Sequence, residues 1–254
     1  MSKTWRLVLE YQGTDFSGWQ RQPGMRTVQL ELETALSRVL GGESVRVFAS
    51  GRTDSGVHAY GQVVSFRTEV ERHPAKLRDG LNATLPADVV CLLAQEAHPD
   101  FHALRCTVGK LYRYVIRVGP VPTALARGRA WQVRYSLDVL AMGKALSFLE
   151  GEHDFTSFRA AGCAARSPVR TINRAAIDVV EGELWIELYG TGFLRHMVRN
   201  IVGALHEVGR QKRPPEWFRE LLDVRDRTQA GVTAPARGLH LVRVDYPAEL
   251  LRPD

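Results

Sequence analysis

The sequence of 254 residues contains only three cysteines, Cys91, Cys106 and Cys163, and they lie far apart. So few cysteines exclude a disulfide framework, and without a C-x-x-C pair the usual spacing of a zinc site is missing as well. The longest uninterrupted apolar run, Val89 to Ala94, is far shorter than the roughly 20 residues of a membrane span. The N-terminus also lacks a long apolar signal core. We therefore expect a cytoplasmic protein with reduced thiols, no metal site and no membrane contact.

Lysine is scarce too, because only five of the 34 basic residues are Lys and the other 29 are Arg. The net charge is +6. Arginine has a flat guanidinium that pairs with phosphates and stacks on bases. Acidic residues are absent between Asp100 and Asp138 and again between Asp154 and Asp178. The basic residues inside these two stretches are Arg105, Lys110, Arg113, Arg117, Arg127, Arg129 and Arg134, and then Arg159, Arg166, Arg170 and Arg174. Basic stretches interleaved with aromatic residues favour an RNA-binding surface over a salt-bridged one.

Hydrophobic periodicity predicts the same order of elements twice. The first half is expected to contain strands at 6–11, 45–50, 61–67 and 89–95 and helices at 28–40 and 74–81. The second half is expected to contain strands at 111–118, 176–180, 184–189 and 239–244 and helices at 137–149 and 194–208, with an additional short helix at 216–222. Thr27 and Ser136 are the expected N-caps of the helices at 28–40 and 137–149.

Two successive β-α-β-β-α-β units predict an α+β protein with two ferredoxin-like (split βαβ) halves. Antiparallel sheets of this kind, with helices on one face, join edge to edge into one mixed, mainly antiparallel sheet. The junction is expected near residues 96–104, which divides the chain into halves at 1–100 and 101–254.

The densest loop signal is the segment GRTDSGVHA at residues 51–59, between two predicted strands. Its two glycines permit tight backbone paths, and Arg52, Asp54 and His58 extend from the same loop. The simpler explanation for an isolated T-D-S-G segment is a turn whose polar side chains hydrogen-bond nearby backbone amides. A carboxylate that is kept ionised by a neighbouring Arg and partly stripped of water is a nucleophile, which makes Asp54 a candidate catalytic residue.

Two further segments carry candidate residues. In the strand KLYRY at 110–114, Tyr112 and Tyr114 share one face. A tyrosine on a sheet is commonly core packing, but it can also stack on a base or transfer a proton. The segment GFLRHMVRNIVG at 192–203 begins a helix that carries Arg199. Arg199 is either a basic side chain extending from the edge of the core or a partner for a carboxylate.

Together, the segments GRTDSGVHAYGQVVSF, DFHALRCTVGKLYRYVI, HDFTSFRA, GFLRHMVRNIVGALHEVG and GLHLVRVDYP resemble the tRNA pseudouridine synthases of the TruA family. The resemblance covers essentially the whole chain in the same order. It implies an enzyme without a cofactor that isomerises uridine to pseudouridine at positions 38, 39 and 40 in the anticodon arm of tRNA. It also implies paired ferredoxin-like halves with a central cleft, and a homodimer that binds tRNA across both subunits.

The resemblance also implies a role for single residues. Asp54 corresponds to the catalytic nucleophile, and Arg199 to the arginine that pairs with its carboxylate. Tyr112 corresponds to the tyrosine that stacks on the target base and is a candidate general base. Leu239 corresponds to an apolar residue under the base. Arg52 corresponds to an arginine that helps hold the flipped nucleotide, and we expect His58 of the same loop to bind substrate as well.

Two other classes of protein remain open from the residues alone. A non-catalytic RNA-binding module is one, because ferredoxin-like sheets often bind RNA through surface aromatics. A glycosylase or a phosphoryl-transfer enzyme is the other, although the sequence lacks a G-x-x-x-x-G-K-[ST] segment. A glycosylase would release free uracil, whereas an isomerase leaves the mass of the RNA unchanged.

Overall fold

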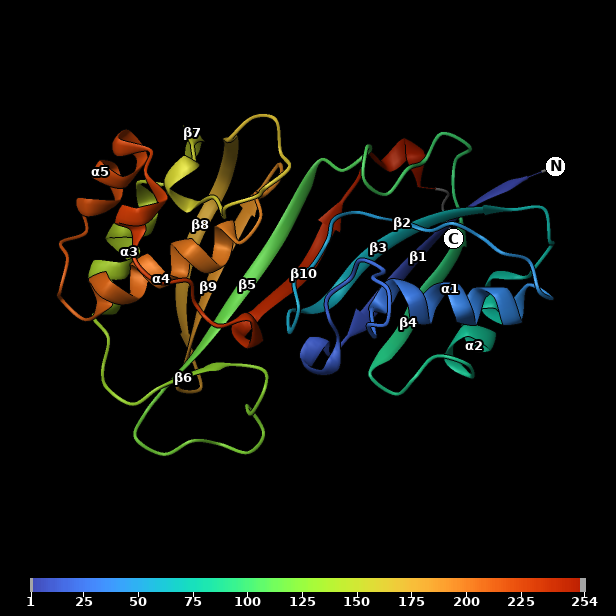
Figure 1. Ribbon diagram of the computed structural model, residues 1–254, viewed down its shortest axis with the longest axis horizontal. Helices are drawn as coiled ribbons and strands as arrows, with labels where there is room; N and C mark the ends of the chain where they lie inside the picture. The colour runs from blue at the N-terminus through green and yellow to red at the C-terminus, as the bar shows by residue number, and fades with distance from the viewer. Residues whose placement is uncertain (1, 252–254) are drawn as a thin grey trace. The chain divides into compact units, whose positions relative to one another are not determined.

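The computed structural model describes residues 2–251, which form two compact units (Figure 1). Unit 1 contains the residues up to Val108 together with those from Leu241 onward. Unit 2 is Gly109–His240. No helix within the described residues is long and apolar enough to cross a membrane. The expected division into halves at 1–100 and 101–254 stays a prediction.

Unit 1 follows the predicted β-α-β-β-α-β order. Its elements are β1 (Lys3–Tyr11), α1 (Val28–Val39), β2 (Phe48–Ala49), β3 (His58–Thr68), α2 (Pro74–Asn82) and β4 (Val89–Glu96). The hydrogen-bonded order is β4-β1-β3, and β2 pairs with the far side of β3. Both β3 and β4 are antiparallel to β1. This is the ferredoxin-like order of strands, which confirms the prediction for this half.

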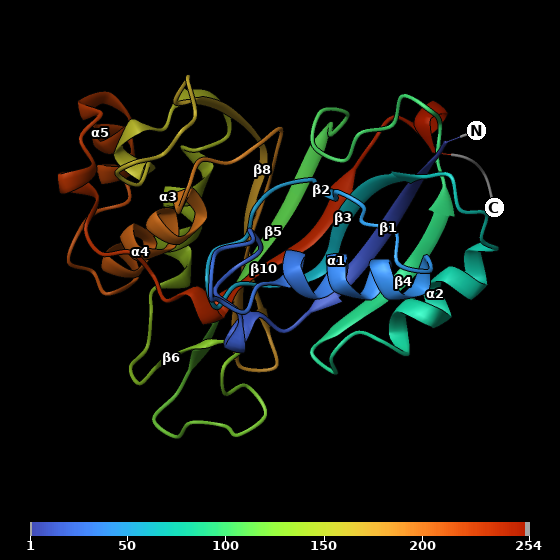
Figure 2. The ribbon, with the colours of Figure 1, turned by 45° about the vertical axis from the view of Figure 1, so that its right-hand side comes forward.

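The core of unit 1 lies between the sheet and its helices. In β1 the residues Trp5, Leu7 and Leu9 are fully buried, as the period of two in a strand requires. In α1 the buried residues are Val28, Leu32, Ala35 and Leu36, which lie on one helical face. Figure 2 shows α1 and α2 side by side on one face of β1, β3 and β4.

Unit 2 repeats this order with additions. Its elements are β5 (Gly109–Val118), β6 (Trp131–Val133), α3 (Val139–Ser147), β7 (Gly151–Asp154), β8 (Val169–Val180), β9 (Glu183–Gly190), α4 (Met197–Gly209) and α5 (Trp217–Val224). The strand order is β5-β9-β8-β7, with β6 on β5. Strand β10 (Leu239–Asp245) begins in unit 2 and continues in unit 1, and it neighbours β3 and β5. The order β10-β5-β9-β8 is again ferredoxin-like, and the ten strands make a mixed, mainly antiparallel sheet. The α+β class is therefore confirmed.

The structure corrects the start of two helices and the capping of a third. Helix α3 is capped by Asp138 and not by Ser136, because the ionised Asp138 carboxylate accepts a 2.9 Å hydrogen bond from the N–H of Ala141. This hydrogen bond lowers the pKa of Asp138. Thr27 does stand at the N-cap of α1, but its side chain accepts no capping hydrogen bond. Helix α4 begins three residues later than predicted, because His196 has a left-handed φ of 60° that a helix cannot include.

Two strands also differ from the prediction. Strand β2 has only two residues, although alternation predicted a strand over 45–50. Val45 and Val47 are buried, so the alternation reflects burial and not pairing with β3. Strand β8 is twelve residues long and starts at Val169. Its first residues pair with β7, and hydrophobic periodicity does not reveal such pairing.

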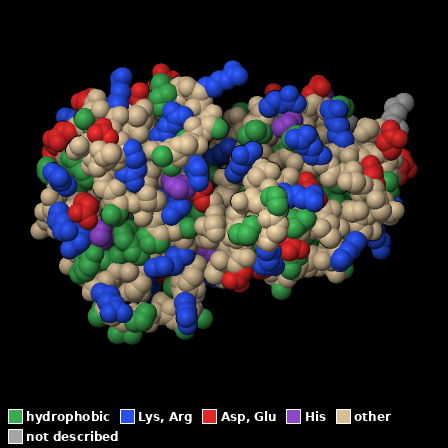
Figure 3. Space-filling model, viewed as in Figure 1, with side chains coloured by type: hydrophobic (Ala, Val, Ile, Leu, Met, Phe, Trp, Pro, Cys, Tyr) green, Lys and Arg blue, Asp and Glu red, His purple; other side chains and the backbone are tan. Residues whose placement is uncertain are grey.

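Lys and Arg side chains are spread widely over the face of the molecule that is drawn in Figure 3.

Candidate active site

Asp54 lies in the loop between β2 and β3 of unit 1, and its side chain is partly exposed. The loop turns back at Asp54, whose carbonyl oxygen accepts a 3.1 Å hydrogen bond from the N–H of Val57. Gly56 has a φ of +77° in this turn. Glycine adopts this conformation without the strain that a Cβ would add. The T-D-S-G residues therefore do make a turn, and that turn presents the carboxylate of Asp54.

The Asp54 loop is held by the segment that follows β1. Trp19 donates its N–H to the carbonyl of Thr53 at 3.0 Å. The carbonyl of Phe16 accepts hydrogen bonds from the Ser55 hydroxyl at 3.1 Å and from the Gly56 N–H at 3.4 Å. Each of these bonds reaches a residue within two positions of Asp54, so the backbone there has little freedom.

Two glycines in that segment allow this close approach. A Cβ on Gly13 would overlap the carbonyl oxygen of Val57. A Cβ on Gly18, whose φ is +87°, would lie 2.8 Å from the carbonyl oxygen of Thr53. Any side chain at either position would push the Asp54 loop away from the segment that holds it.

A buried polar network supports the loop from the sheet side. The Tyr11 hydroxyl forms a 2.8 Å hydrogen bond with the Thr53 hydroxyl. Gln62 on β3 donates to the carbonyl of Gly51 at 3.0 Å and accepts from the Ser50 hydroxyl at 2.6 Å. Burial raises the pKa of Tyr11 to about 12, although the hydrogen bonds with Thr53 and Gln62 act against the rise. The phenol of Tyr11 therefore keeps its proton at neutral pH.

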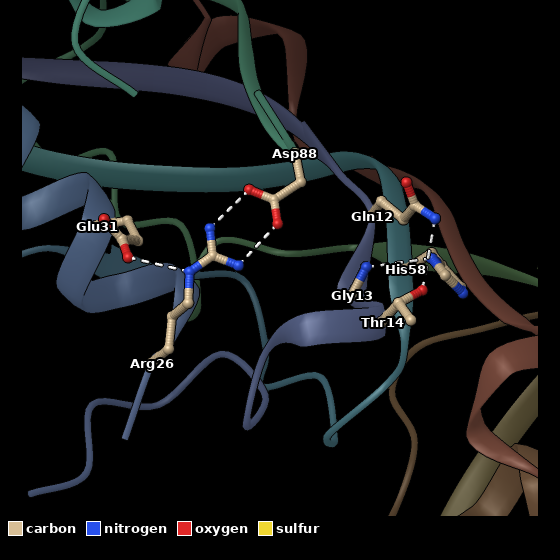
Figure 4. Close-up of polar contacts among 7 residues, drawn as sticks. All are labelled: Gln12, Gly13, Thr14, Arg26, Glu31, His58 and Asp88. Carbon is tan, nitrogen blue, oxygen red and sulfur yellow. Dashed lines mark hydrogen bonds and ion pairs between the residues drawn. The ribbon is translucent and has the colours of Figure 1, made fainter. Parts of the chain in front are cut away.

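Arg26 anchors the supporting segment (Figure 4). Its guanidinium makes two 2.8 Å hydrogen bonds to the two carboxylate oxygens of Asp88 and lies 3.3 Å from Glu31. The same guanidinium stacks 4.1 Å from the ring centre of Phe16, whose carbonyl holds the Asp54 loop. Hydrogen bonding to Asp88 raises the pKa of Arg26. A bidentate pair of this kind fixes orientation as well as charge.

Arg52 and His58 occupy different environments. The Arg52 side chain is exposed, and within residues 2–251 the structure gives it no hydrogen bond or ion pair. His58 is 4% exposed, and its Nδ1 accepts a 3.1 Å hydrogen bond from the N–H of Gly13, which places the ring proton on Nε2 (Figure 4). The structure thus gives His58 a part in holding the loop. Contacts of Arg52 and His58 with RNA stay predictions.

In unit 2, Tyr112 lies on β5 opposite Leu188 of β9. The side chain is 8% exposed, and its ring packs edge-on against Phe193 with 5.1 Å between the ring centres. Phe193 lies in the loop between β9 and α4. An aromatic pair of this geometry restricts the orientation of the tyrosine ring.

Arg199 lies in the first turn of α4 and is tied to the segment that precedes β10. Its Nε donates to the carbonyl of Ala234 at 2.8 Å, and the Ala234 N–H donates back to the carbonyl of Arg199 at 3.0 Å. The fully buried Asn200 fixes the same segment, because its side-chain oxygen accepts from Thr233 at 2.6 Å and from Arg227 at 3.0 Å. The guanidinium of Arg199 is thereby oriented through its Nε.

Leu239 is the first residue of β10 and is 6% exposed. The preceding turn packs against β5, because the Tyr114 hydroxyl donates to the carbonyl of Pro235 at 2.7 Å. A Cβ on Gly238 would lie 2.6 Å from the Tyr114 ring. Burial raises the pKa of Tyr114, and the charges of Arg199 and Arg237 partly oppose the rise.

The six predicted site residues thus divide between the units. Unit 1 carries Arg52, Asp54 and His58, and unit 2 carries Tyr112, Arg199 and Leu239. In unit 2, α4 and the turn before Leu239 both contact β5. Sequence reasoning missed the residues that support these side chains, namely Tyr11, Gly13, Gln62, Phe193 and Asn200, because each acts through a contact distant in sequence. No group of three potential metal ligands occurs within the described residues.

The chain is similar to a family of known proteins. The family model for tRNA pseudouridine synthase matches residues 7–104 and 145–247. The chain is 48% identical over 243 residues to tRNA pseudouridine synthase A of Syntrophotalea carbinolica, covering 95% of each chain. It is 47% identical over 244 residues to tRNA pseudouridine synthase A of Brevibacillus brevis, covering 96% of this chain and 100% of the relative. The chain belongs to the tRNA pseudouridine synthase family. It is therefore an enzyme of an isomerase family, and the sequence resemblance is confirmed.

We expect Tyr11→Phe to lower the free energy of unfolding by about 1 to 2 kcal/mol at pH 7, because it removes a buried hydroxyl that bonds Thr53. The pKa of Tyr11 is raised, so the native phenol keeps its proton at a pH where the unfolded chain has lost it. The stabilisation is therefore complete below pH 10 and is lost as the pH rises towards about 12. The free energy of unfolding of both proteins can be measured with urea at pH 7, 9 and 10.5. The difference between Tyr11→Phe and the unmodified protein should become smaller only at pH 10.5.

Thr68→Val is the matched control, because it also removes a buried hydroxyl. The Thr68 hydroxyl donates to Glu43, and Thr68 lies at the end of β3 that is far from the Asp54 loop. Both variants should be destabilised, but only Tyr11→Phe should also slow pseudouridine formation. Equal rates for the two variants would contradict a role of Tyr11 in positioning the Asp54 loop.

Proposed function

We propose that this enzyme converts uridine to pseudouridine at positions 38, 39 and 40 of the tRNA anticodon stem-loop, with Asp54 as the nucleophile. The observation that carries the proposal is the rigid Asp54 turn in a chain that belongs to the tRNA pseudouridine synthase family. Nucleophilic catalysis requires a reactive oxygen at a fixed position, and the contacts of Thr53, Ser55 and Gly56 supply that position. The anticodon positions rest on the resemblance of the sequence to the TruA family.

The reaction begins with extrusion of the target nucleotide. A uridine in a stem is stacked and paired, so reaching its glycosidic bond costs a few kcal/mol of unstacking. Phosphate contacts from the basic stretches offset this cost. Arg52, which is exposed on the Asp54 loop, is proposed to help hold the flipped nucleotide, and His58 is proposed to support binding from the same loop.

The chemistry exchanges one bond to the ribose for another. The N1–C1′ bond breaks, the uracil turns, and a C5–C1′ bond forms, after which C5 loses a proton and N1 carries one. Asp54 adds to the uracil ring, attacks C1′ or first deprotonates C2′, and these three routes remain alternatives. In each route the detached base stays in the site, where confinement acts as a high effective concentration.

The residues of unit 2 are proposed to complete the site. Arg199 is proposed to pair with the carboxylate of Asp54 and to orient it, as the resemblance to the TruA family implies. Tyr112 stacks on the uracil and is the candidate base for the C5 proton. Leu239 contacts the ring from its apolar side and excludes water, so that rejoining outcompetes hydrolysis. No cofactor enters this scheme.

The proposed location and oligomeric state of the enzyme follow from the same resemblance. We expect a cytoplasmic homodimer that binds one tRNA across two subunits. Sedimentation equilibrium of the purified protein tests the dimer, and titration with unmodified tRNA tests the stoichiometry.

The proposed function is tested by incubating the purified protein with an unmodified tRNA transcript and no added metal. Pseudouridine is then located by carbodiimide treatment and primer extension. We expect new stops at positions 38 to 40 and no release of free uracil. Release of uracil would indicate a glycosylase, and a folded protein that binds tRNA without any new stop would indicate a non-catalytic RNA-binding module.

A further inference from the structure

A cluster of aromatic and basic side chains lies on unit 1, on the face of the sheet opposite α1 and α2. Trp5 and Leu7 on β1 are fully buried and face the helices, so Arg6 between them faces the other side. Arg6 pairs with Ser65 on β3, and Ser65 pairs with Phe48 on β2. Paired residues point to the same face of a sheet, so Phe48 lies opposite the helices that Figure 2 shows. Phe48 is 38% exposed.

Two flat side chains lie next to the Phe48 ring. The centre of the His102 ring is 4.9 Å from the centre of the Phe48 ring, with 45° between the planes. The guanidinium carbon of Arg46 lies 5.1 Å from the same ring centre. The loop that carries His102 is fixed on this face of the sheet, because the Ala103 N–H donates to the Ser65 hydroxyl at 3.0 Å. Two partly exposed rings and a guanidinium thus lie together at fixed positions.

Two further arginines border the rings. Arg67 follows Ser65 by two residues on β3, so it lies on the same face, and it donates to the carbonyl of Pro99 at 2.8 Å. The Arg105 N–H donates to Nδ1 of His102 at 3.4 Å. Burial lowers the pKa of His102, and the charges of Arg105 and Arg67 lower it further, so the ring is uncharged at neutral pH. The Phe48 cluster, as we name it, consists of Arg46, Phe48, Arg67, His102 and Arg105.

The three arginines of the Phe48 cluster have exposed side chains, and none of them forms an ion pair within residues 2–251. The acidic residues closest to them in sequence point elsewhere or have other partners. Glu43 accepts the hydroxyl of Thr68. The Asp100 carboxylate lies 3.8 Å from Nδ1 of His98. Glu69 is exposed and follows the last residue of β3. The positive charge of the cluster is therefore available to an anionic partner.

The combination of rings and arginines fits an unpaired nucleotide. Proteins bind single-stranded nucleic acid with aromatic rings on which bases stack and with arginines that pair with the phosphates. A guanidinium also stacks on a base and forms paired hydrogen bonds to phosphate oxygens. An acidic peptide would neutralise the arginines but would leave both rings without a stacking partner.

The Phe48 cluster is separate from the Asp54 turn. Phe48 lies opposite Ser65, whereas the Asp54 turn comes directly before His58 at the start of β3. Ser65 is seven residues from His58 along this strand, which corresponds to about 23 Å at 3.3 Å per residue. A base that stacks on Phe48 is therefore not the base that Asp54 attacks.

We propose that the Phe48 cluster binds an unpaired nucleotide of the tRNA substrate other than the target uridine. The base stacks on Phe48 beside Arg46, and the adjacent phosphates pair with Arg67 and Arg105. The inference rests on the proposed function, because it takes tRNA as the substrate. It adds a second point of contact on unit 1, so that the tRNA is held both at the Asp54 turn and at this cluster.

The test compares tRNA binding by variants of the full-length protein over a range of salt concentrations. Phe48→Leu removes the ring and no charge, so the Kd should rise about five- to tenfold while the slope of log affinity against log salt stays the same. Phe48→Tyr keeps a ring and should bind like the unmodified protein. Arg46→Gln should reduce the slope by about 0.7, the loss of one phosphate contact to a single strand.

Arg38→Gln is the matched control for Arg46→Gln. Arg38 is also exposed and forms no ion pair within the described part of the chain, but it lies in the last turn of α1, on the other face of the sheet. Its Kd and its slope should equal those of the unmodified protein. Urea unfolding checks that each variant is folded under the conditions of the binding experiment.

Two results would overturn the inference. Phe48→Leu and Arg46→Gln with unchanged Kd and slope would do so, and would leave a protein as the partner of the cluster. Equal weakening by Phe48→Leu and Phe48→Tyr would do so as well, because the ring would then act through packing and not through stacking. Pseudouridine formation by the unmodified protein is measured separately. If it occurs while the variants bind normally, only this inference fails, and if it is absent while the variants bind weakly, only the proposed function fails.

Discussion

Asp54→Asn should abolish pseudouridine formation and leave tRNA binding unchanged. The amide has nearly the same shape as the carboxylate but lacks the negative oxygen that adds to the uracil ring or the ribose. Loss of a catalytic nucleophile typically lowers kcat by at least about 10³-fold. The turn itself should persist, because its hydrogen bonds use the backbone of Asp54 and the neighbouring residues. Single-turnover conversion of unmodified tRNA and a filter-binding titration measure the two quantities.

Asp79→Asn provides the control for this experiment. Asp79 lies on α2 of unit 1, and its carboxylate pairs with the neighbouring Arg78 on the surface. This variant should retain full activity, because a surface pair of this kind contributes little. Substantial turnover by Asp54→Asn would refute the nucleophile, whereas loss of both binding and turnover would point to a damaged loop.

Gly203→Ala should destabilise unit 2 by about 2 to 4 kcal/mol, because a well-packed backbone contact has to open. Gly203 lies in α4, and a Cβ there would overlap the carbonyl oxygen of Val232. Val232 is two residues from Ala234, which orients the guanidinium of Arg199. Urea unfolding should show the loss of stability, and the residual folded protein should also have a lower kcat.

Gly143→Ala is the matched change in the neighbouring helix α3. Its Cβ would meet only the Ile177 side chain, at an ordinary 3.5 Å. Alanine in a helix interior is favoured over glycine, so this variant should be more stable by about 0.5 to 1 kcal/mol. The two substitutions should change the free energy of unfolding in opposite directions. This result would distinguish the tertiary contact of Gly203 from the helix propensity of alanine. A destabilisation of the same size in both variants would contradict the contact with Val232.

Much of the fold follows from local patterns that the sequence displays directly. Burial of Val28, Leu32, Ala35 and Leu36 produces a helical period, and burial of Trp5, Leu7 and Leu9 produces a strand period. Elements whose strand pairing is not reflected in a burial pattern could not be predicted in this way. Strand β7 is polar, and the start of β8 mixes polar residues with the exposed Val169 and the buried Ile172. Both are strands because they pair with each other.

The candidate site also has residues that the sequence predicts and residues that it does not. Asp54, Tyr112 and Arg199 stand in segments whose residue types and order resemble a known family, so they could be named from the sequence. The residues that hold them could not, because Tyr11 reaches Thr53 across 42 positions and Arg199 reaches Ala234 across 35. Nor could periodicity indicate that His196 takes a left-handed conformation and delays the start of α4.

The sequence by itself determined the family, the class of chemistry and the repeated order of helices and strands, since these depend on residue type and local spacing. Only the tertiary structure decided which backbone atoms hold the Asp54 turn, which carbonyl orients Arg199 and which aromatic ring packs against Tyr112. These features depend on contacts between residues far apart in the chain, and a local pattern contains no information about such distances.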